Sequence, residues 1–164
     1  CQDIFIDINP PVTIRYHAIA GSDMPMYSIE QMIPHRGTMK LVQEIVEIGD
    51  SRCVTASTVS PDWPTFDNGS VSPIVLIELA AQTTGVNIGW HELQSDRPSG
   101  RVGWLVGVKR AEFYIDRIPV NTRILTIIEQ GPSEGTYAVI AGRAKVDSEL
   151  IGEMDLQGFR PEEA

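Results

Sequence analysis

The longest apolar pattern in the chain runs from Ser72 to Gly89 and predicts a helix on which the rest of the fold is built. Ser72 is a favourable N-cap residue and Pro73 a favourable first helical residue, so we expect the helix to begin here. At the helical period, the apolar side chains of this segment point in almost every direction. Such a pattern is typical of a buried helix.

One narrow arc of this helix differs from the rest. At the same period, the arc contains Glu78, Gln82, Gly85 and Gly89. A carboxylate on an otherwise apolar helix lies either against water at an edge of the fold or inside the protein for a functional reason. Glu78 is therefore the first candidate for chemistry.

Strand-like runs lie on both sides of the helix. Before it, residues 40–48 and 53–59 predict a hairpin that turns at Gly49 and Asp50. After it come four further runs, at 102–115, 122–130, 136–146 and 150–159. The remaining segments predict a helical turn at 28–32, a loop at 61–72 and a break at 131–135. Since strands and helices do not alternate, we expect an α+β fold in which a curved antiparallel sheet of about five to six strands wraps one long helix.

The domain organisation follows from length and composition. With 164 residues, of which 42% are hydrophobic, the chain suits one domain with a single core. We expect residues 28–164 to form this domain and residues 1–27 to be an arm of it, with extended pieces at 3–8 and 13–18.

Charge and cysteine content narrow the function classes. A net charge of −9 argues against a general nucleic-acid binder. Six basic residues nevertheless lie between positions 97 and 123. They form either a local basic face for an acidic partner or separate charges exposed to solvent. Two cysteines and no apolar run of about 20 residues predict a soluble, cytoplasmic protein without a membrane span. No cofactor or metal site is indicated.

Three blocks, at residues 33–42, 77–82 and 103–113, carry a resemblance to a known family. The chain resembles the hot-dog-fold β-hydroxyacyl-thioester dehydratases of fatty-acid synthesis (FabA/FabZ-like), especially their aryl-polyene-type relatives. The resemblance implies a hot-dog fold, active sites at a dimer interface, and removal of water from a 3-hydroxyacyl thioester on acyl carrier protein or coenzyme A. A homodimer or higher homo-oligomer is thereby expected.

The resemblance also implies which residues act. In this family a His and the helix Glu share proton abstraction at C2 and protonation of the C3 hydroxyl, and Glu78 matches that Glu. The better-known branch carries its His directly after an Asn-Gly pair, where this chain has Ser70. His35 is the remaining candidate, because the relatives share its Pro-His-x-Gly-x-Met block and its ordinary pKa of about 6.5 suits a base. Alternatively, His35 only fixes the loop that enters the first strand.

Further binding residues are expected around Glu78. Gln82, one turn on, is placed to orient the carboxyl or is purely structural. Ser70 supplies a hydroxyl close to the position of the missing His. The family often has Gly at the position of Pro73, where its amide polarises the thioester carbonyl. Pro73 has no N–H, so the amides of Ile74 or Val75 are the expected substitutes.

Three functions remain open at this point. The first is a 3-hydroxyacyl-thioester dehydratase. The second is a hot-dog acyl-thioesterase, in which Glu78 activates water. The third is a non-catalytic acyl-binding protein that kept the fold after losing the usual His and Gly.

Overall fold

The computed structural model describes residues 27–95, 104–134 and 137–159. The expected extended pieces at 3–8 and 13–18 lie outside this range, as do Arg97 and Arg101 of the basic cluster. None of the helices in the described residues has the length and apolar character needed to cross a membrane.

The elements follow the predicted order. The helical elements are α1 (Ile29–Met32), the 3-10 turn η1 (Gly37–Met39) and α2 (Val75–Gln94). The strands are β1 (Glu44–Ile48), β2 (Arg52–Thr58), β3 (Ser70–Val71), β4 (Trp104–Phe113), β5 (Ile118–Pro119), β6 (Arg123–Glu134), β7 (Tyr137–Val146) and β8 (Glu149–Phe159).

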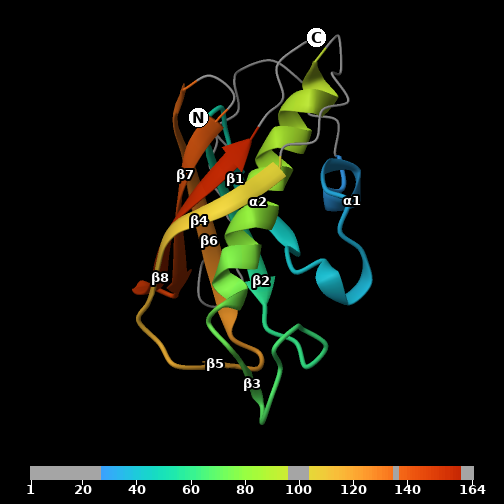
Figure 1. Ribbon diagram of the computed structural model, residues 1–164. Helices are drawn as coiled ribbons and strands as arrows, with labels where there is room; N and C mark the ends of the chain where they lie inside the picture. The colour runs from blue at the N-terminus through green and yellow to red at the C-terminus, as the bar shows by residue number, and fades with distance from the viewer. Residues whose placement is uncertain (1–26, 96–103, 135–136, 160–164) are drawn as a thin grey trace.

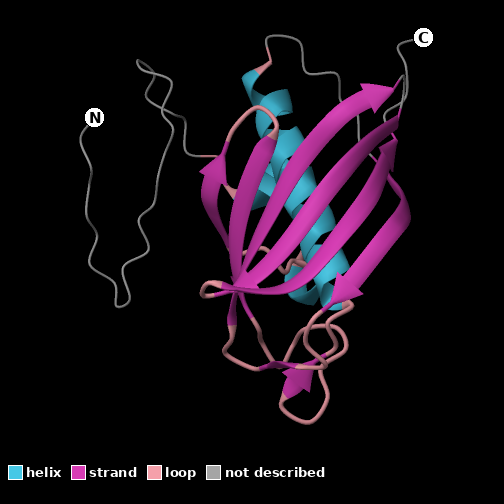
Figure 2. Cartoon of the chain, turned by 90° about the vertical axis from the view of Figure 1, so that its left-hand side faces the viewer, coloured by secondary structure: helices cyan, strands magenta, loops and turns pink. Residues whose placement is uncertain are grey.

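One antiparallel sheet wraps the long helix. Six strands form it in the order β1-β2-β6-β7-β8-β4, while β3 and β5 make a separate pair. The sheet curves around α2, as Figures 1 and 2 show from two directions. The expected α+β hot-dog fold, with one central helix in a curved sheet, is confirmed.

The core lies between α2 and the concave face of the sheet. Leu76, Leu79 and Ala80 of the helix are fully buried there. Glycines in the sheet allow the close approach, since a Cβ at Gly152 would lie 2.9 Å from Leu76 Cδ1. Burial of this kind contributes roughly 1.5–3 kcal/mol for each large apolar side chain.

Several predicted boundaries were wrong. The strand β1 begins at Glu44 rather than at residue 40, and α2 ends at Gln94 rather than at Gly89. The helix begins at Val75, because residues 73 and 74 form a turn whose bonds run from Leu76 N to Pro73 O and from Ile77 N to Ile74 O. In this turn, the amides at the start of the helix each donate to the carbonyl three residues earlier, so they are not left without acceptors. Residues 131–134 of the expected break are instead part of β6, which accommodates the extra residues by a register shift between Gln130 and Ser133.

The segment before β1 packs against the arc of α2 that contains Glu78, Gln82, Gly85 and Gly89. A Cβ at Gly89 would lie 2.3 Å from Met32 O, and one at Gly85 would lie 3.0 Å from Ile33 Cγ2. Two glycines on one helix face therefore let the backbone at the end of α1 lie directly on α2. Further along the same face, this segment reaches Gln82 and Glu78.

Candidate active site

His35 and Glu78 meet on the face where this segment lies against α2. The atoms His35 Nε2 and Glu78 Oε1 are 3.4 Å apart. The two side chains are 33% and 36% exposed in the single chain, so the pair is open to a substrate. The structure thus brings these two predicted residues together within one chain.

Gln82 connects the pair to the backbone behind it. Its Oε1 accepts hydrogen bonds from Leu41 N at 2.9 Å and from Val42 N at 3.3 Å. Its Nε2 donates to Met39 O at 2.7 Å and to Glu78 Oε1 at 2.8 Å. Since Gln82 is fully buried and these partners fix which end of the amide is the donor, its N–H is a rigid contact to the carboxyl.

Two atoms of the pair are left without partners. The second carboxylate oxygen of Glu78, Oε2, has no hydrogen bond among the described residues. The ring nitrogen His35 Nδ1 is buried and likewise has no partner in that part of the chain. The arrangement can therefore offer Glu78 Oε2 to a substrate hydroxyl while Oε1 is held by Gln82.

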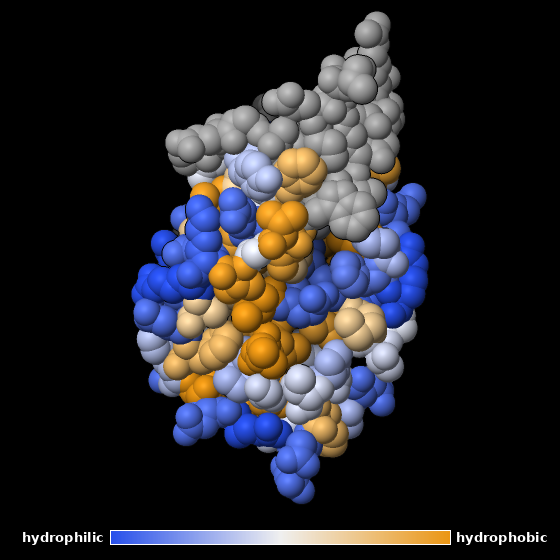
Figure 3. Space-filling model, in the orientation of Figure 1, coloured by the Kyte–Doolittle hydropathy of each residue, from blue (hydrophilic) through white to orange (hydrophobic). Residues whose placement is uncertain are grey.

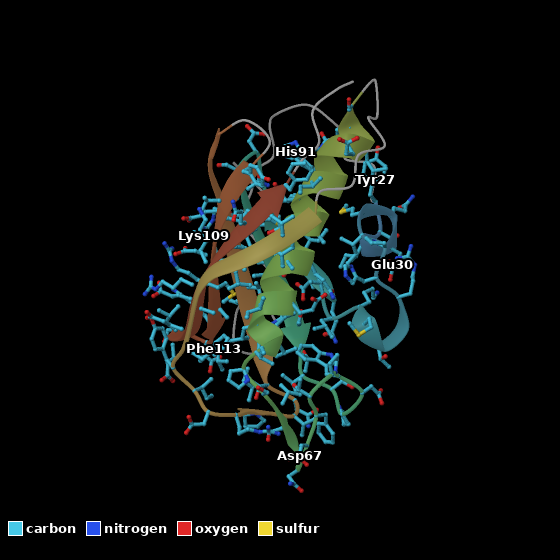
Figure 4. The ribbon with its side chains drawn as sticks, viewed as in Figure 1. Tyr27, Glu30, Asp67, His91, Lys109 and Phe113 are labelled. Carbon is cyan, nitrogen blue, oxygen red and sulfur yellow. The ribbon has the colours of Figure 1, made fainter. Side chains whose placement is uncertain are left out.

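The loop at 61–72 holds its own polar groups. Ser70 Oγ donates to Asp67 O at 3.3 Å and accepts from Arg117 Nε at 3.0 Å. Arg117 Nη2 also donates to Asp67 O at 2.8 Å and to Ser70 O at 3.0 Å. None of these bonds reaches the pair, and Asp67 lies at the tip of the loop beyond the helix start (Figure 4). Ser70 is thus not joined to His35 and Glu78.

The two amides expected at the thioester oxygen are already engaged. Val75 N donates to Ser72 O at 3.2 Å, and Ile74 N donates to Ser72 Oγ at 3.4 Å. A thioester would have to displace these bonds. The contacts of Ile74 and Val75 to substrate therefore stay predictions to which no step is assigned.

Other reactive groups lie elsewhere. His91 is exposed near the far end of α2, with Nε2 3.1 Å from Asp50 O. Cys53 is buried, and burial raises the pKa of its thiol to about 12, which removes it as a nucleophile. Among the described residues, His, Cys, Asp and Glu form no group that could hold a metal ion.

Sequence reasoning missed Arg36. Its guanidinium donates to the backbone carbonyls of Glu30, Ile33 and His35. It also missed Lys40, whose ammonium pairs with the Glu30 carboxylate and lowers the pKa of that carboxyl. Arg36 belongs to the Pro-His-x-Gly-x-Met block and Lys40 follows it directly. Their closeness to His35 in the sequence was the signal that could have identified them.

The proteins to which this chain is similar in sequence include dehydratases. The profile of the ApeP-like family, described as ApeP dehydratase, matches residues 27–164. The 3-hydroxyacyl-[acyl-carrier-protein] dehydratase FabZ of Streptococcus pyogenes (strain Manfredo) is 33% identical over 135 residues, which cover 77% of this chain and 91% of that protein.

Solved structures share the fold. The dehydratase heterocomplex ApeI:P from Xenorhabdus doucetiae superposes with a TM-score of 0.70 at 19% identity, covering 82% of this chain and 91% of that one. A hypothetical thioesterase from Streptococcus pneumoniae, solved with coenzyme A, gives a TM-score of 0.57 at 14% identity and covers 73% and 86%. At these identities the likeness is one of fold alone. The family match spans every described residue, so this chain belongs to the ApeP-like dehydratase family.

Proposed function

We propose that this protein removes water from a 3-hydroxyacyl thioester, carried by acyl carrier protein or coenzyme A, to give the enoyl thioester. The observation that supports this most is the contact of His35 Nε2 with Glu78 Oε1 at 3.4 Å on an accessible face. Dehydration needs a base at C2 and an acid at the C3 hydroxyl, and one imidazole beside one carboxyl supplies both.

In the proposed reaction, His35 acts as base and Glu78 as acid. Nε2 of the neutral imidazole takes the C2 proton, and the electron pair of that C–H bond forms the C2–C3 double bond. The C3–O bond breaks as the protonated Glu78 gives its proton to the hydroxyl, which leaves as water. The products are the enoyl thioester and water, and the site is left with an imidazolium and a carboxylate.

The short distance between the two groups explains how the site returns to its starting state. After the reaction, one proton must move from the imidazolium to the carboxylate. The 3.4 Å between Nε2 and Oε1 leaves room for this transfer, directly or through one water. The two residues therefore pass this proton between them in every cycle, and we expect them to act as one unit.

Gln82 is proposed as the residue that orients the acid. Its N–H holds Oε1 at 2.8 Å, so the carboxyl cannot rotate freely and Oε2 keeps one direction. Fixing a reacting group in this way lowers the entropic part of the barrier.

We further propose that a second copy of the chain covers the site. The two edges of the six-stranded sheet differ, because β1 carries Glu44 and Glu47, which pair with Arg123 of β6 and Arg52 of β2, whereas the first half of β4 presents exposed apolar side chains. The charged residues of β4, Lys109, Arg110 and Glu112, lie in its second half. On β4, Leu105, Val106 and Val108 are 44%, 51% and 44% exposed. Hydrophobic residues gather on the face where β4 crosses α2 (Figure 3). A charged edge resists pairing and an apolar one favours it.

The α2 surface continues this apolar face. Ile74 is 54% exposed, and Ile77, Ala81 and Ile88 are only partly buried. The expected burial of the helix on all sides is thus not achieved by one chain. A second chain on this face would remove Ile74 from water and shield the nearby pair.

The dimer is tested by the mass in solution. Val106→Lys places a charge on the β4 edge and should convert a dimer to a monomer in sedimentation analysis. Val139→Lys, on the outer face of β7 and 38% exposed, is the matched control and should leave the mass unchanged. A wild-type chain that sediments as a monomer would contradict the homodimer.

The reaction is tested with 3-hydroxyacyl thioesters of acyl carrier protein and coenzyme A. Formation of enoyl thioester, followed by absorbance and mass spectrometry, is the expected result. Glu78→Gln and His35→Ala should each abolish it. Release of free thiol without enoyl product would instead identify a thioesterase, and acyl binding without turnover would identify a binding protein.

A further inference from the structure

Arg36 makes an unusual set of contacts for an exposed arginine. Nη1 donates to Ile33 O and to His35 O, both at 2.7 Å, and Nη2 donates to Glu30 O at 2.7 Å. All three acceptors are backbone carbonyls of one short segment. Hydrogen bonds from a charged guanidinium are stronger than neutral ones, and the planar group fixes the relative directions of its acceptors.

These carbonyls lie on both sides of His35. The Ile33 carbonyl belongs to the peptide bond before Pro34, and the His35 carbonyl belongs to the peptide bond after the histidine. Pro34 restricts its own φ angle, so little backbone freedom remains between the two held peptides. The Glu30 carbonyl ties the same guanidinium to α1, which lies on α2 at Gly89.

The chain direction after Arg36 agrees with this arrangement. Gly37 has a φ of +58°, and nothing lies within 4 Å of the Cβ it lacks. Its backbone conformation, rather than space, requires glycine there. The turn at Gly37 lets the arginine side chain fold back over the residues that precede it.

From these contacts we infer that Arg36 is a positioning residue: its guanidinium holds the backbone around His35 so that the imidazole stays against Glu78. The inference rests on the proposed function in so far as His35 acts as the base. It assigns to Arg36 no contact with substrate. Lysine cannot replace it, because a single ammonium does not reproduce the planar fork that reaches three carbonyls.

Arg117 provides the matched control. It too makes three hydrogen bonds to one loop, to Ser70 Oγ, Asp67 O and Ser70 O, and it is also exposed. Loss of Arg117 therefore removes as many bonds from the fold as loss of Arg36. Only the loss of Arg36 should affect the imidazole of His35.

The test compares Arg36→Lys with Arg117→Lys in the full chain. Three quantities are measured: kcat and KM, the thermal unfolding midpoint, and the imidazole signals of His35 in NMR spectra, identified with a His35→Asn variant. For Arg36→Lys we expect kcat to fall about 10- to 100-fold with KM within about twofold, as a misplaced base predicts. The His35 signals should shift or broaden, and Arg117→Lys should leave them and kcat unchanged.

A second variant, Arg36→Ala, guards against a purely structural effect. Guanidinium ion added at millimolar concentration should restore part of its kcat and of the wild-type His35 signals. Unchanged His35 signals in Arg36→Lys, or equal kcat losses in the two lysine variants, would overturn the inference. Shifted His35 signals with wild-type kcat would instead leave the positioning role standing and contradict His35 as the base.

Discussion

Two loops lie beside the first half of α2, and they use their polar groups in opposite ways. The segment at 33–42 directs His35 to Glu78 and presents the Met39 carbonyl and the Leu41 and Val42 amides to Gln82. In the loop at 61–72, Ser70 and its neighbours instead bond to each other and to Arg117. The better-known branch of the family carries its His in the second loop, where this chain has Ser70, and His35 comes instead from the first.

The helix supplies the carboxyl of this site and its support, whereas the segment at 33–42 supplies the imidazole. Glu78 and Gln82 lie one turn apart on one face of α2. A base needs only to reach the carboxyl with the right geometry, and both loops approach the same end of the helix. Function is thus assigned by contacts at Glu78, not by the position of a histidine in the sequence.

The largest expected effect separates the two loops directly. His35→Asn removes the base and should lower kcat by about 100- to 10,000-fold. Ser70→Ala removes one acceptor of Arg117 and should leave kcat within about threefold, since its hydroxyl is not joined to the pair. Steady-state rates of enoyl formation measure both. A loss in Ser70→Ala as large as that in His35→Asn would show that the second loop takes part in the chemistry.

A smaller effect is expected from the support behind the carboxyl. Gln82→Glu keeps the acceptor for the Leu41 and Val42 amides but replaces the donor to Glu78. The carboxyl of Glu78 becomes charged as it gives up its proton. Because a hydrogen bond to a charged group contributes about 1.5–3 kcal/mol, kcat should fall roughly 10- to 100-fold. Gln82→Glu buries an extra carboxyl, and so does the control variant Asn87→Asp, so both should lower the free energy of unfolding.

The control for Gln82 is Asn87→Asp, at the other end of α2. Asn87 is also a buried amide, with Nδ2 donating to Gly49 O at 2.7 Å and Oδ1 accepting from Gln130 at 2.6 Å. Its variant should be destabilised by a similar amount and retain wild-type kcat per folded molecule. Equal losses of kcat would mean that Gln82 acts only through stability.

The smallest effect concerns two glycines, Gly89 in α2, on which α1 lies, and Gly69 in the loop at 61–72. Gly89→Ala places a Cβ 2.3 Å from Met32 O, so α1 must move off α2 and carry His35 with it. We expect a loss of about 1–3 kcal/mol in stability and a drop of a few-fold in kcat. Gly69→Ala, at a φ of +78° with open space around it, should cost about 1–2 kcal/mol without changing kcat. Urea unfolding measures the loss of stability in each variant, and steady-state rates show whether kcat falls only in Gly89→Ala. An equal fall of kcat in Gly69→Ala would contradict this expectation.

Much of the fold follows from local patterns. The hairpin turn at Gly49 and the sheet strands were predictable because alternation and turn residues act over a few residues. The start of α2 at Val75 was not, because Ser72 bonds the first amides as part of a tight turn. Pro132 suggested a break, whereas β6 absorbs it in a register shift, which depends on its partner β7.

Of the predicted site residues, the structure brings His35, Glu78 and Gln82 together and leaves Ser70 apart, and the connections among them were not predictable. Glu78 and His35 were found from the helix pattern and from the family resemblance. That Gln82 bonds the backbone of residues 39–42, and that Arg36 holds three carbonyls, depends on how α1 and η1 lie against α2. The glycines of the helix arc carried the signal for that contact, since a helix face of this kind admits a close backbone.

The central claim is that His35 and Glu78 act as one unit, and the most direct test is the rate of the double variant. We predict that kcat of His35→Asn/Glu78→Gln is about as low as that of the slower single variant, because residues that act together are strongly non-additive. The distance of 3.4 Å between Nε2 and Oε1 is the basis for this expectation. Losses that multiply, as for two independent residues, or a single variant with wild-type kcat, would contradict it.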